Sequence, residues 1–190
     1  MLEKLLEFDK KAFVAINSGM ENSFLDWLCP ILRTQEIWYP FYAIVIYFLI
    51  KKYKKDSIKI ILAAVLLIVA SDQFSSNLIK NTFMRIRPCS EPTLVGHVRH
   101  LVESCRGYSF ISAHATNHFA IALFFAFYFK NTSKYIFPIA IFWASSIAFS
   151  QVYVGVHYPL DVIVGALVGL LFGFAFAKYS SNFVNVADNS

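Results

Sequence analysis

A histidine and an aspartate late in the chain have the types and the spacing of a catalytic pair. His157 and Asp161 are four residues apart, Pro159 lies between them, and an apolar run follows. Proline favours the first turn of a helix, so we expect a helix to begin near Tyr158 with His157 at its start. At this spacing the carboxylate can hold one ring nitrogen while the other acts as a base or nucleophile.

A cluster of cations precedes this pair in the chain. Lys80 and Arg87 are seven residues apart, so they share a face if one helix carries both. An ammonium and a guanidinium on one face suit an oxyanion such as phosphate. The alternative is that both are interfacial residues whose charged ends reach water.

A second polar cluster begins at Ser112 and leads into an apolar run. We expect Ser112 to cap a helix, whose first N–H groups then favour an anion. The small side chain of Ala113 lets a ligand approach that backbone closely. His114, in the first turn, is expected to donate a proton to a leaving oxygen. His118, one turn further on, is either a supporting residue of the site or a satisfied core histidine.

The elements that position these residues are predicted to be membrane helices. The chain has 190 residues, of which 57% are hydrophobic and only 15% charged, with a mean hydropathy of +0.55. This composition predicts an all-α, polytopic transmembrane bundle forming a single domain over residues 1–190. An amphipathic helix is expected at residues 2–17. Five spans are expected at 37–50, 58–79, 111–129, 135–152 and 160–177, and a sixth within 12–33.

The basic segment 51–55 sets the expected topology. It carries four lysines in five residues and should be cytoplasmic, which puts the three polar clusters outside and the C-terminus in the cytoplasm. The N-terminus lacks the features of a cleaved signal peptide, so we expect the protein to be retained in the membrane. The net charge of +5 falls in short loops, which favours a lipid partner over nucleic acid. Cys89 and Cys105 flank the outer loop and are either paired or two free thiols. Nothing in the sequence specifies an oligomeric state.

Taken together, the three clusters resemble the tripartite signature of the type 2 phosphatidic acid phosphatase superfamily of membrane lipid phosphatases. That signature reads Lys, six residues, Arg-Pro; then Pro-Ser-Gly-His; then Ser-Arg, five residues, His, three residues, Asp. In this chain it is matched, over residues 80–161, by Lys80, Arg87, Pro88, Ser112, His114, Ser150, His157 and Asp161.

The resemblance implies a metal-independent phosphohydrolase that needs no cofactor and forms a phosphohistidine intermediate. His157 would attack phosphorus with Asp161 stabilising its imidazolium, and His114 would serve as general acid and base. The phosphate oxygens would be held by Lys80, Arg87, Ser112, Gln151 and the amide of Ala113. The implied substrate is a lipid phosphate or diphosphate in the outer leaflet of the bacterial inner membrane. Undecaprenyl diphosphate is favoured over lipid A and phosphatidylglycerophosphate.

Three positions depart from the signature. Ile111 replaces the proline, Ala113 replaces the glycine, and Gln151 replaces an arginine that binds phosphate in the family. The last change removes a charge and a bidentate donor, which typically costs about 10²–10³ in rate. Three explanations are open: another cation supplies the charge, activity is low, or the substitution was engineered. The candidates for that cation are Arg85, Arg99 and Arg106.

Two other functions fit the same residues. A metal-dependent hydrolase would use His114, His118, His157 and Asp161 as ligands of zinc or iron. A non-catalytic lipid-phosphate-binding protein would keep the fold without turnover, because a binding site can survive the loss of a donor needed only in the transition state.

Overall fold

The computed structural model describes residues 1–103 and 105–184, and the regular secondary structure of this part is helical throughout. Its α-helices are α1 (Leu2–Asn17), α2 (Ser23–Leu32), α3 (Tyr39–Tyr53), α4 (Ser57–Asp72), α5 (Lys80–Phe83), α6 (Ala113–Phe129), α7 (Ile136–Tyr153) and α8 (Pro159–Ser181). A π-helical segment, η3 (Gln73–Ile79), joins α4 to α5. The short 3-10 helices are η1 (Gln35–Trp38), η2 (Lys54–Asp56), η4 (Pro88–Ser90) and η5 (Pro92–Leu94).

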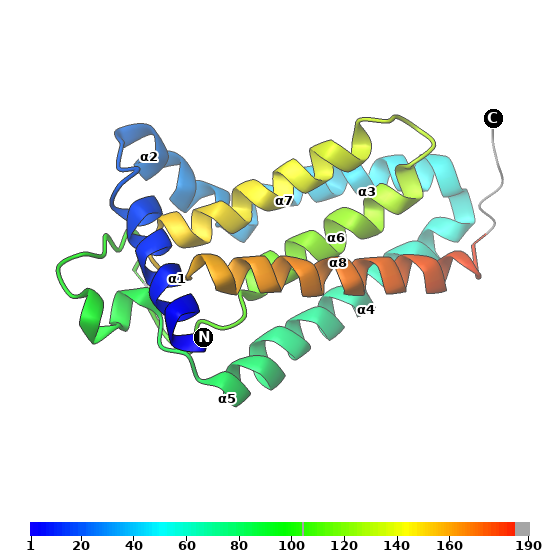
Figure 1. Ribbon diagram of the computed structural model, residues 1–190. Coiled ribbons are helices and arrows are strands. Elements are labelled where there is room, and N and C mark those ends of the chain that lie inside the picture. Colours follow the sequence, from blue (N-terminus) through cyan, green and yellow to red (C-terminus); the bar gives the residue numbers. More distant parts are fainter. Residues whose placement is uncertain (104, 185–190) are drawn as a thin grey trace.

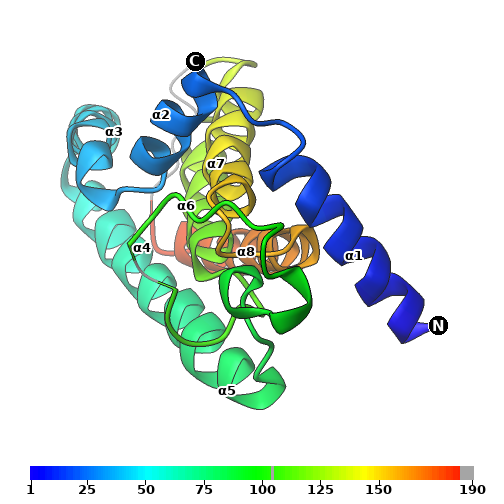
Figure 2. The ribbon, with the colours of Figure 1, turned by 90° about the vertical axis from the view of Figure 1, so that its left-hand side faces the viewer.

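Helix α6 lies at the centre of the bundle, with α4, α7 and α8 packed around it (Figures 1 and 2). Ten of its 17 residues are buried, because its sequence is apolar on every side rather than along one stripe. Phe119 packs in one core cluster with residues of α7, and Phe124 packs in a second cluster with residues of α4. The N-terminal turn of α6, which carries His114, is therefore fixed by packing on several sides.

Helix α8 approaches α6 closely through three glycines spaced four residues apart, Gly165, Gly169 and Gly173. A methyl group added at Gly169 would collide with the backbone of Thr116, so only glycine permits this approach. Small residues at this spacing let membrane helices pack backbone to backbone. At the N-terminal ends of the two helices, the Ser112 N–H donates to the Asp161 carbonyl over 3.1 Å. The starts of α6 and α8 are thereby locked together.

The three polar clusters lie at one end of the bundle. The ends of α5 and α7, the starts of α6 and α8, and the loop residues 84–103 and 105–112 gather at the left of Figure 1. The turn around η2 and the loop between α6 and α7 lie at the opposite end. The predicted convergence of distant segments at one end of the bundle is therefore observed.

The N-terminal segment differs from the expected sixth span. Residues 12–33 are divided between α1 and α2, which are separate helices with a break at 18–22. Helix α2 has ten residues, about 15 Å, which is too short to cross a bilayer core of about 30 Å. Helix α1 lies across the end of the bundle (Figure 2). It buries Phe13 against the edge of Tyr158, with ring centroids 5.5 Å apart.

Three helical segments of the described chain are long and apolar enough to cross a membrane, namely 35–94, 136–153 and 159–181. The first contains both α3 and α4, which pack on each other on either side of the η2 turn. At four of the five expected runs the helices begin and end within four residues of the expected bounds. In the run 58–79, α4 ends at Asp72 and the π-helical η3 continues to Ile79. The total number of crossings stays a prediction.

Candidate active site

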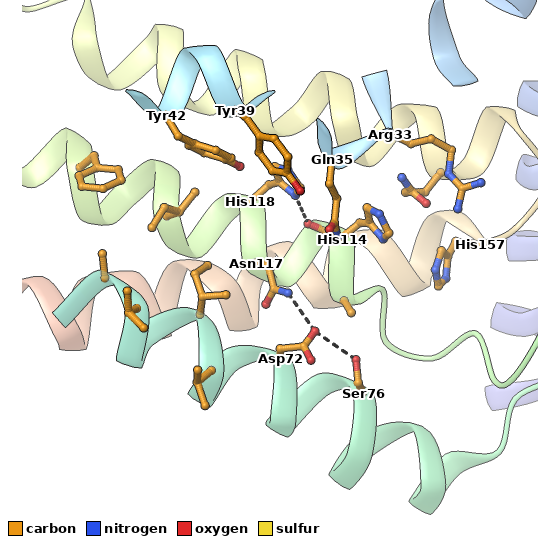
Figure 3. A pocket seen from close by; sticks show the side chains of 18 of the residues that line it. Arg33, Gln35, Tyr39, Tyr42, Asp72, Ser76, His114, Asn117, His118 and His157 are labelled. Carbon is orange, nitrogen blue, oxygen red and sulfur yellow. Dashed lines mark hydrogen bonds between the residues drawn. The ribbon is translucent and has the colours of Figure 1, made fainter. Parts of the chain in front are cut away.

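A cavity of about 640 Å³ opens between α3, α4 and α6 and reaches the end of the bundle where the polar clusters meet (Figure 3). It is lined by Arg33, Gln35, Tyr39, Tyr42, Ile46, Ile61, Ala64, Val65, Ile68, Val69, Asp72, Ser76, Lys80, Arg87, Ala113, His114, Asn117, His118, Ile121, Phe125, Gln151 and His157. Six of the positions predicted from the sequence to act on phosphate are among them: Lys80, Arg87, Ala113, His114, Gln151 and His157.

The cavity is polar at one end and apolar at the other. His114 is in the first turn of α6, and Phe125 is eleven residues further along the same helix, about 16 Å away. The lining beside Phe125 comes from aliphatic residues of α3 and α4. Figure 3 shows Arg33, His114 and His157 together at the opposite end. Such a cavity can hold a charged headgroup and an attached hydrocarbon chain at the same time.

His157 lies in the loop between α7 and α8 and is 2% exposed. Its Nδ1 is 3.5 Å from Oδ2 of Asp161, a separation longer than an ordinary hydrogen bond. Because Asp161 does not line the cavity, Nε2 is the ring nitrogen that a substrate can reach. Burial lowers the pKa of His157 to about 4, although Asp161 acts in the opposite direction. The imidazole is therefore neutral at pH 7, as a nucleophile must be.

Asp161 is fixed by contacts from three directions and is fully buried. Its Oδ2 accepts the Tyr158 N–H over 2.9 Å in a capping box at the start of α8. Its Oδ1 accepts Nη1 of Arg85 over 2.7 Å, and Nη2 of the same arginine donates to Asp9 over 2.6 Å. The predicted helix start at Tyr158 is confirmed by the N-cap at that residue.

Arg85 therefore lies behind Asp161 and does not line the cavity. Its guanidinium is sandwiched between two carboxylates and lies 3.9 Å above the Tyr158 ring. The expectation that Arg85 replaces the missing motif arginine does not fit this geometry. Asp9 was not found from the sequence, because nothing in an N-terminal helix marks one acidic residue among several as a partner of Asp161.

Lys80 and Arg87 reach the cavity by a bend rather than along one helical face. Helix α5 ends at Phe83, and Met84 has a left-handed backbone with φ of +45°. Arg87 is in an extended segment, where its Nη1 donates to the Val156 carbonyl over 3.2 Å. Because His157 directly follows Val156 in the chain, this bond holds the Arg87 guanidinium close to His157.

The start of α6 has the predicted cap. Ser112 is the N-cap, and its hydroxyl accepts the Ala115 N–H over 3.4 Å. The first N–H groups of the helix, including that of His114, have no intrahelical acceptor and favour an anion. Ser112 itself is fully buried and does not line the cavity, so its hydroxyl fixes the helix end.

His118 was interpreted from the sequence as either a supporting residue of the site or a satisfied core histidine, and it has features of both. Its Nδ1 is 2.8 Å from the His114 carbonyl, and its ring packs on the edge of Trp143. It also lines the cavity, where its ring stacks on that of His114 with centroids 6.2 Å apart. It is a buried and hydrogen-bonded histidine that also shapes the wall behind His114.

Gln151 is fully buried, and neither its Nε2 nor its Oε1 has a hydrogen-bond partner in the described chain. Arg99 is committed elsewhere: it pairs with Asp26 over 2.5 Å and donates to the Asn17 carbonyl over 3.2 Å. Arg106 is exposed. Neither arginine lines the cavity, so the expectation that one of them compensates for Gln151 is not supported.

Two charged cavity residues were not found from the sequence. Arg33 is the C-cap of α2, and Asp72 is the last residue of α4. Asp72 accepts Nδ2 of Asn117 over 3.0 Å and the Ser76 hydroxyl over 3.3 Å (Figure 3). Asp72 is the one carboxylate in an otherwise apolar stretch of more than ten residues, which was a usable signal. Arg33 carries no such signal, because a basic residue after an apolar helix is common at membrane interfaces.

The geometry does not group the histidines as metal ligands. Within residues 1–103 and 105–184, one set of three metal-ligating side chains has its ligand atoms within 4.8 Å of one another: Cys89, His100 and Cys105. The two cysteines of that set form a disulfide, with Cα atoms 6.2 Å apart. The paired alternative for the outer-loop cysteines is therefore the one observed.

The family model of the PAP2 superfamily matches residues 61–184, which is more than half of the chain. The chain belongs to the PAP2 superfamily. The resemblance noted in the signature residues is thereby confirmed, and a phosphoric-ester hydrolase activity is supported by the names of the relatives.

Two relatives and one solved structure show how far the similarity of this PAP2 protein extends. The lipid A 4'-phosphatase of Porphyromonas gingivalis is 33% identical over 184 residues, covering 94% of this chain and 75% of the relative. The undecaprenyl-diphosphatase of Sulfolobus acidocaldarius is 29% identical over 186 residues, covering 94% and 82%.

The crystal structure of a PAP2-type phosphatidylglycerolphosphate phosphatase from Bacillus subtilis superposes with a TM-score of 0.76. It shares 20% identity and covers 96% of this chain and 89% of that one. This likeness shows the common fold. The relatives are membrane lipid phosphatases, and the apolar helices agree with an integral membrane protein.

Proposed function

We propose that the protein hydrolyses a phosphate monoester of a membrane lipid through a phosphohistidine intermediate. The observation that carries this proposal is that His114, His157, Lys80 and Arg87 line one cavity whose far end is apolar. A phosphoryl group at the polar end would leave its lipid chain in the aliphatic part, which is the arrangement that a lipid phosphatase requires.

In the proposed first step, Nε2 of His157 attacks phosphorus and a nitrogen–phosphorus bond forms as the bond to the lipid oxygen breaks. His114 gives its proton to that leaving oxygen. Asp161, held by Arg85 and by the Tyr158 N–H, stabilises the positive charge that develops on the His157 ring. In the second step His114 takes a proton from water, and the resulting hydroxide releases phosphate from His157.

The negative charge that develops on the nonbridging oxygens would be met by Lys80, Arg87, the first N–H groups of α6 and the Gln151 amide. Arg87 is held by its bond to the Val156 carbonyl and the start of α6 by the Ser112 cap, and such preorganised donors contribute most because little has to reorganise when charge develops. The proposed role of Ser112 is to cap α6 so that the Ala113 and His114 N–H groups point toward the phosphate.

The polar middle of the cavity favours a phosphorylated sugar, as in lipid A, over a lipid diphosphate. Gln35, Tyr39, Asp72 and Asn117 line the wall beside the phosphate end. They can donate to and accept from sugar hydroxyl and amide groups, whereas the Asp72 carboxylate would repel a second phosphate. The Porphyromonas relative agrees with this substrate, and the Sulfolobus relative keeps undecaprenyl diphosphate, favoured from the sequence, as its competitor.

We further propose that the cavity faces away from the cytoplasm. The lysine-rich segment 51–55 lies at the opposite end of the bundle from the cavity. The Cys89–Cys105 disulfide closes the loop at the cavity end, and disulfides persist in oxidising compartments. Both features support an outward site and a cytoplasmic C-terminus.

The test is phosphate release by the purified protein from lipid A, undecaprenyl diphosphate and phosphatidylglycerophosphate in matched detergent micelles. We expect lipid A to be hydrolysed with the highest kcat/KM and His157→Ala to abolish release without lowering the melting temperature. Preference for undecaprenyl diphosphate would overturn the sugar-recognition argument. Release from none of the three lipids would overturn the lipid phosphatase proposal.

A further inference from the structure

Arg33 is the one cavity cation outside the signature and outside the stretch matched by the family model. It follows the last residue of α2, and its side chain points into the polar end of the cavity beside His157 (Figure 3). Its Nε is buried without a hydrogen-bond partner in the part of the chain that the structure describes. A buried N–H donor without an acceptor is costly, and no ion pair with Arg33 is found in the described residues, so we expect a ligand in the cavity to be the partner of this side chain.

Two other arginines of this end of the bundle are held by carboxylates. Arg85 is paired with Asp9 and Asp161, and Arg99 is paired with Asp26. Arg33 has no such ion pair in the described chain, and the one carboxylate that lines the cavity, Asp72, already accepts two hydrogen bonds. The charge of Arg33 is therefore available to an anion.

The position at which the signature has an arginine is occupied here by a neutral side chain in the same cavity. Both polar atoms of the Gln151 amide are buried and unpartnered in the described chain. The site thus has a neutral amide at the signature position, and the Arg33 guanidinium enters the same cavity from the end of another helix. Arg33, Lys80 and Arg87 against Asp72 give the cavity a net charge of about +2, which matches a phosphate monoester dianion.

We propose that Arg33 binds a nonbridging oxygen of the phosphoryl group and supplies the positive charge that the signature position 151 lacks. The proposal rests on the proposed phosphatase function of the cavity. The proposed role of Arg33 explains how a chain with glutamine at position 151 keeps a site for a doubly charged group. The guanidinium that the signature places on α7 is supplied here from the end of α2. Arg33 is then a phosphate-binding residue, and Gln151 adds one neutral hydrogen bond.

The experiment compares Arg33→Ala, Arg33→Lys, Gln151→Arg and the double variant Arg33→Ala/Gln151→Arg. Arg106→Ala is the matched control, since it removes an exposed guanidinium outside the cavity. Each protein is assayed with p-nitrophenyl phosphate and with lipid A, and orthovanadate binding is measured by the shift in melting temperature. The vanadate arm needs no turnover and no knowledge of the lipid.

We expect Arg33→Ala to lower kcat/KM by about 10²–10³ and to remove most of the vanadate shift, as for loss of one transition-state donor. Lysine should restore part of the activity, because it keeps the charge without the planar fork. Gln151→Arg should restore most of the activity in the Arg33→Ala background and change the parent protein less than tenfold.

The proposal is overturned if Arg33→Ala keeps kcat/KM and vanadate binding within threefold of Arg106→Ala. It is also overturned if Gln151→Arg raises activity equally in both backgrounds, because the two positions would then be independent. Hydrolysis of p-nitrophenyl phosphate that depends on Arg33, without hydrolysis of any lipid, would support this proposal and overturn the lipid substrate instead. If Arg33→Ala does not fold, the lysine and Gln151→Arg variants carry the comparison.

Discussion

Replacing Arg85 by methionine tests the cluster that holds Asp161 in place. Arg85 is 16% exposed, whereas its two partners Asp9 and Asp161 are 4% and 0% exposed. The substitution leaves two buried carboxylates without a cation. Losing one partner of a buried ion pair costs about 3–5 kcal/mol. Because some water reaches the Arg85 side chain, we expect the lower value, about 3 kcal/mol, or a fall in melting temperature of roughly 6–12 °C.

The stability lost in Arg85→Met should depend on pH. Burial raises the pKa of Asp9, and the ion pair with Arg85 acts against that rise. Without Arg85 the pKa of Asp9 rises further, so the folded state binds protons more readily than the unfolded state as pH falls. The destabilisation of Arg85→Met should therefore be full at neutral pH and shrink as pH falls through the raised pKa.

The assay is thermal unfolding in detergent between pH 4.5 and 8, with Arg106→Met as the exposed control. Adding Asp9→Asn to Arg85→Met removes one of the two unpaired carboxylates and should recover about half of the lost stability at neutral pH. The reasoning fails if Arg85→Met melts within about 1 °C of the parent protein, or if Asp9→Asn brings no recovery.

Three further predictions follow from other parts of the molecule. Gly169→Ala should lower the free energy of unfolding by about 1–3 kcal/mol, because the added methyl group meets the Thr116 backbone. The control is Leu167→Ala on the exposed face of α8. An unchanged melting temperature of Gly169→Ala would contradict the close contact between α8 and α6. Replacing Cys89 and Cys105 by serine opens a loop with a sequence separation of 16 and should lower the free energy of unfolding by about 3 kcal/mol. The measurement is unfolding of the parent protein and the double variant under non-reducing conditions. Equal stability of the two would show that the disulfide does not constrain the unfolded chain. Because burial lowers the pKa of His157 to about 4, its ring should take up a proton only below about pH 5 in a titration followed by nitrogen NMR. Protonation near pH 6.5 would show that the imidazole is not held neutral by burial.

The site could be predicted from the sequence to the extent that local rules and motif spacing carried it. Pro159 and Asp161 marked the start of α8, and Ser112 marked the start of α6, because capping depends on neighbouring residues only. The apolar runs located the helices. The gathering of the clusters at one end followed from the alternation of those runs.

What the sequence did not reveal depends on contacts between distant segments. Arg33 and Asp9 come from the first 33 residues and meet His157 and Asp161 only through the tertiary fold. The bend at Met84 brings Lys80 and Arg87 together although no common helix carries them. The four-residue glycine spacing in α8 was visible in the sequence and predicts close helix packing, but not which helix packs there.

The central claim is that His157 forms a bond to phosphorus while His114 serves the same phosphoryl group. In its most direct test, the protein is mixed with a phosphorus-labelled aryl phosphate and the reaction is stopped rapidly without acid. The labelled peptide is then identified. A p-nitrophenyl leaving group needs no protonation, so with p-nitrophenyl phosphate His114→Ala should still form the intermediate and accumulate it, because activation of water is lost. The account predicts an acid-labile, base-stable label on the peptide that contains His157, more of it in His114→Ala and none in His157→Ala. A label on another residue, or turnover by His157→Ala, would contradict it.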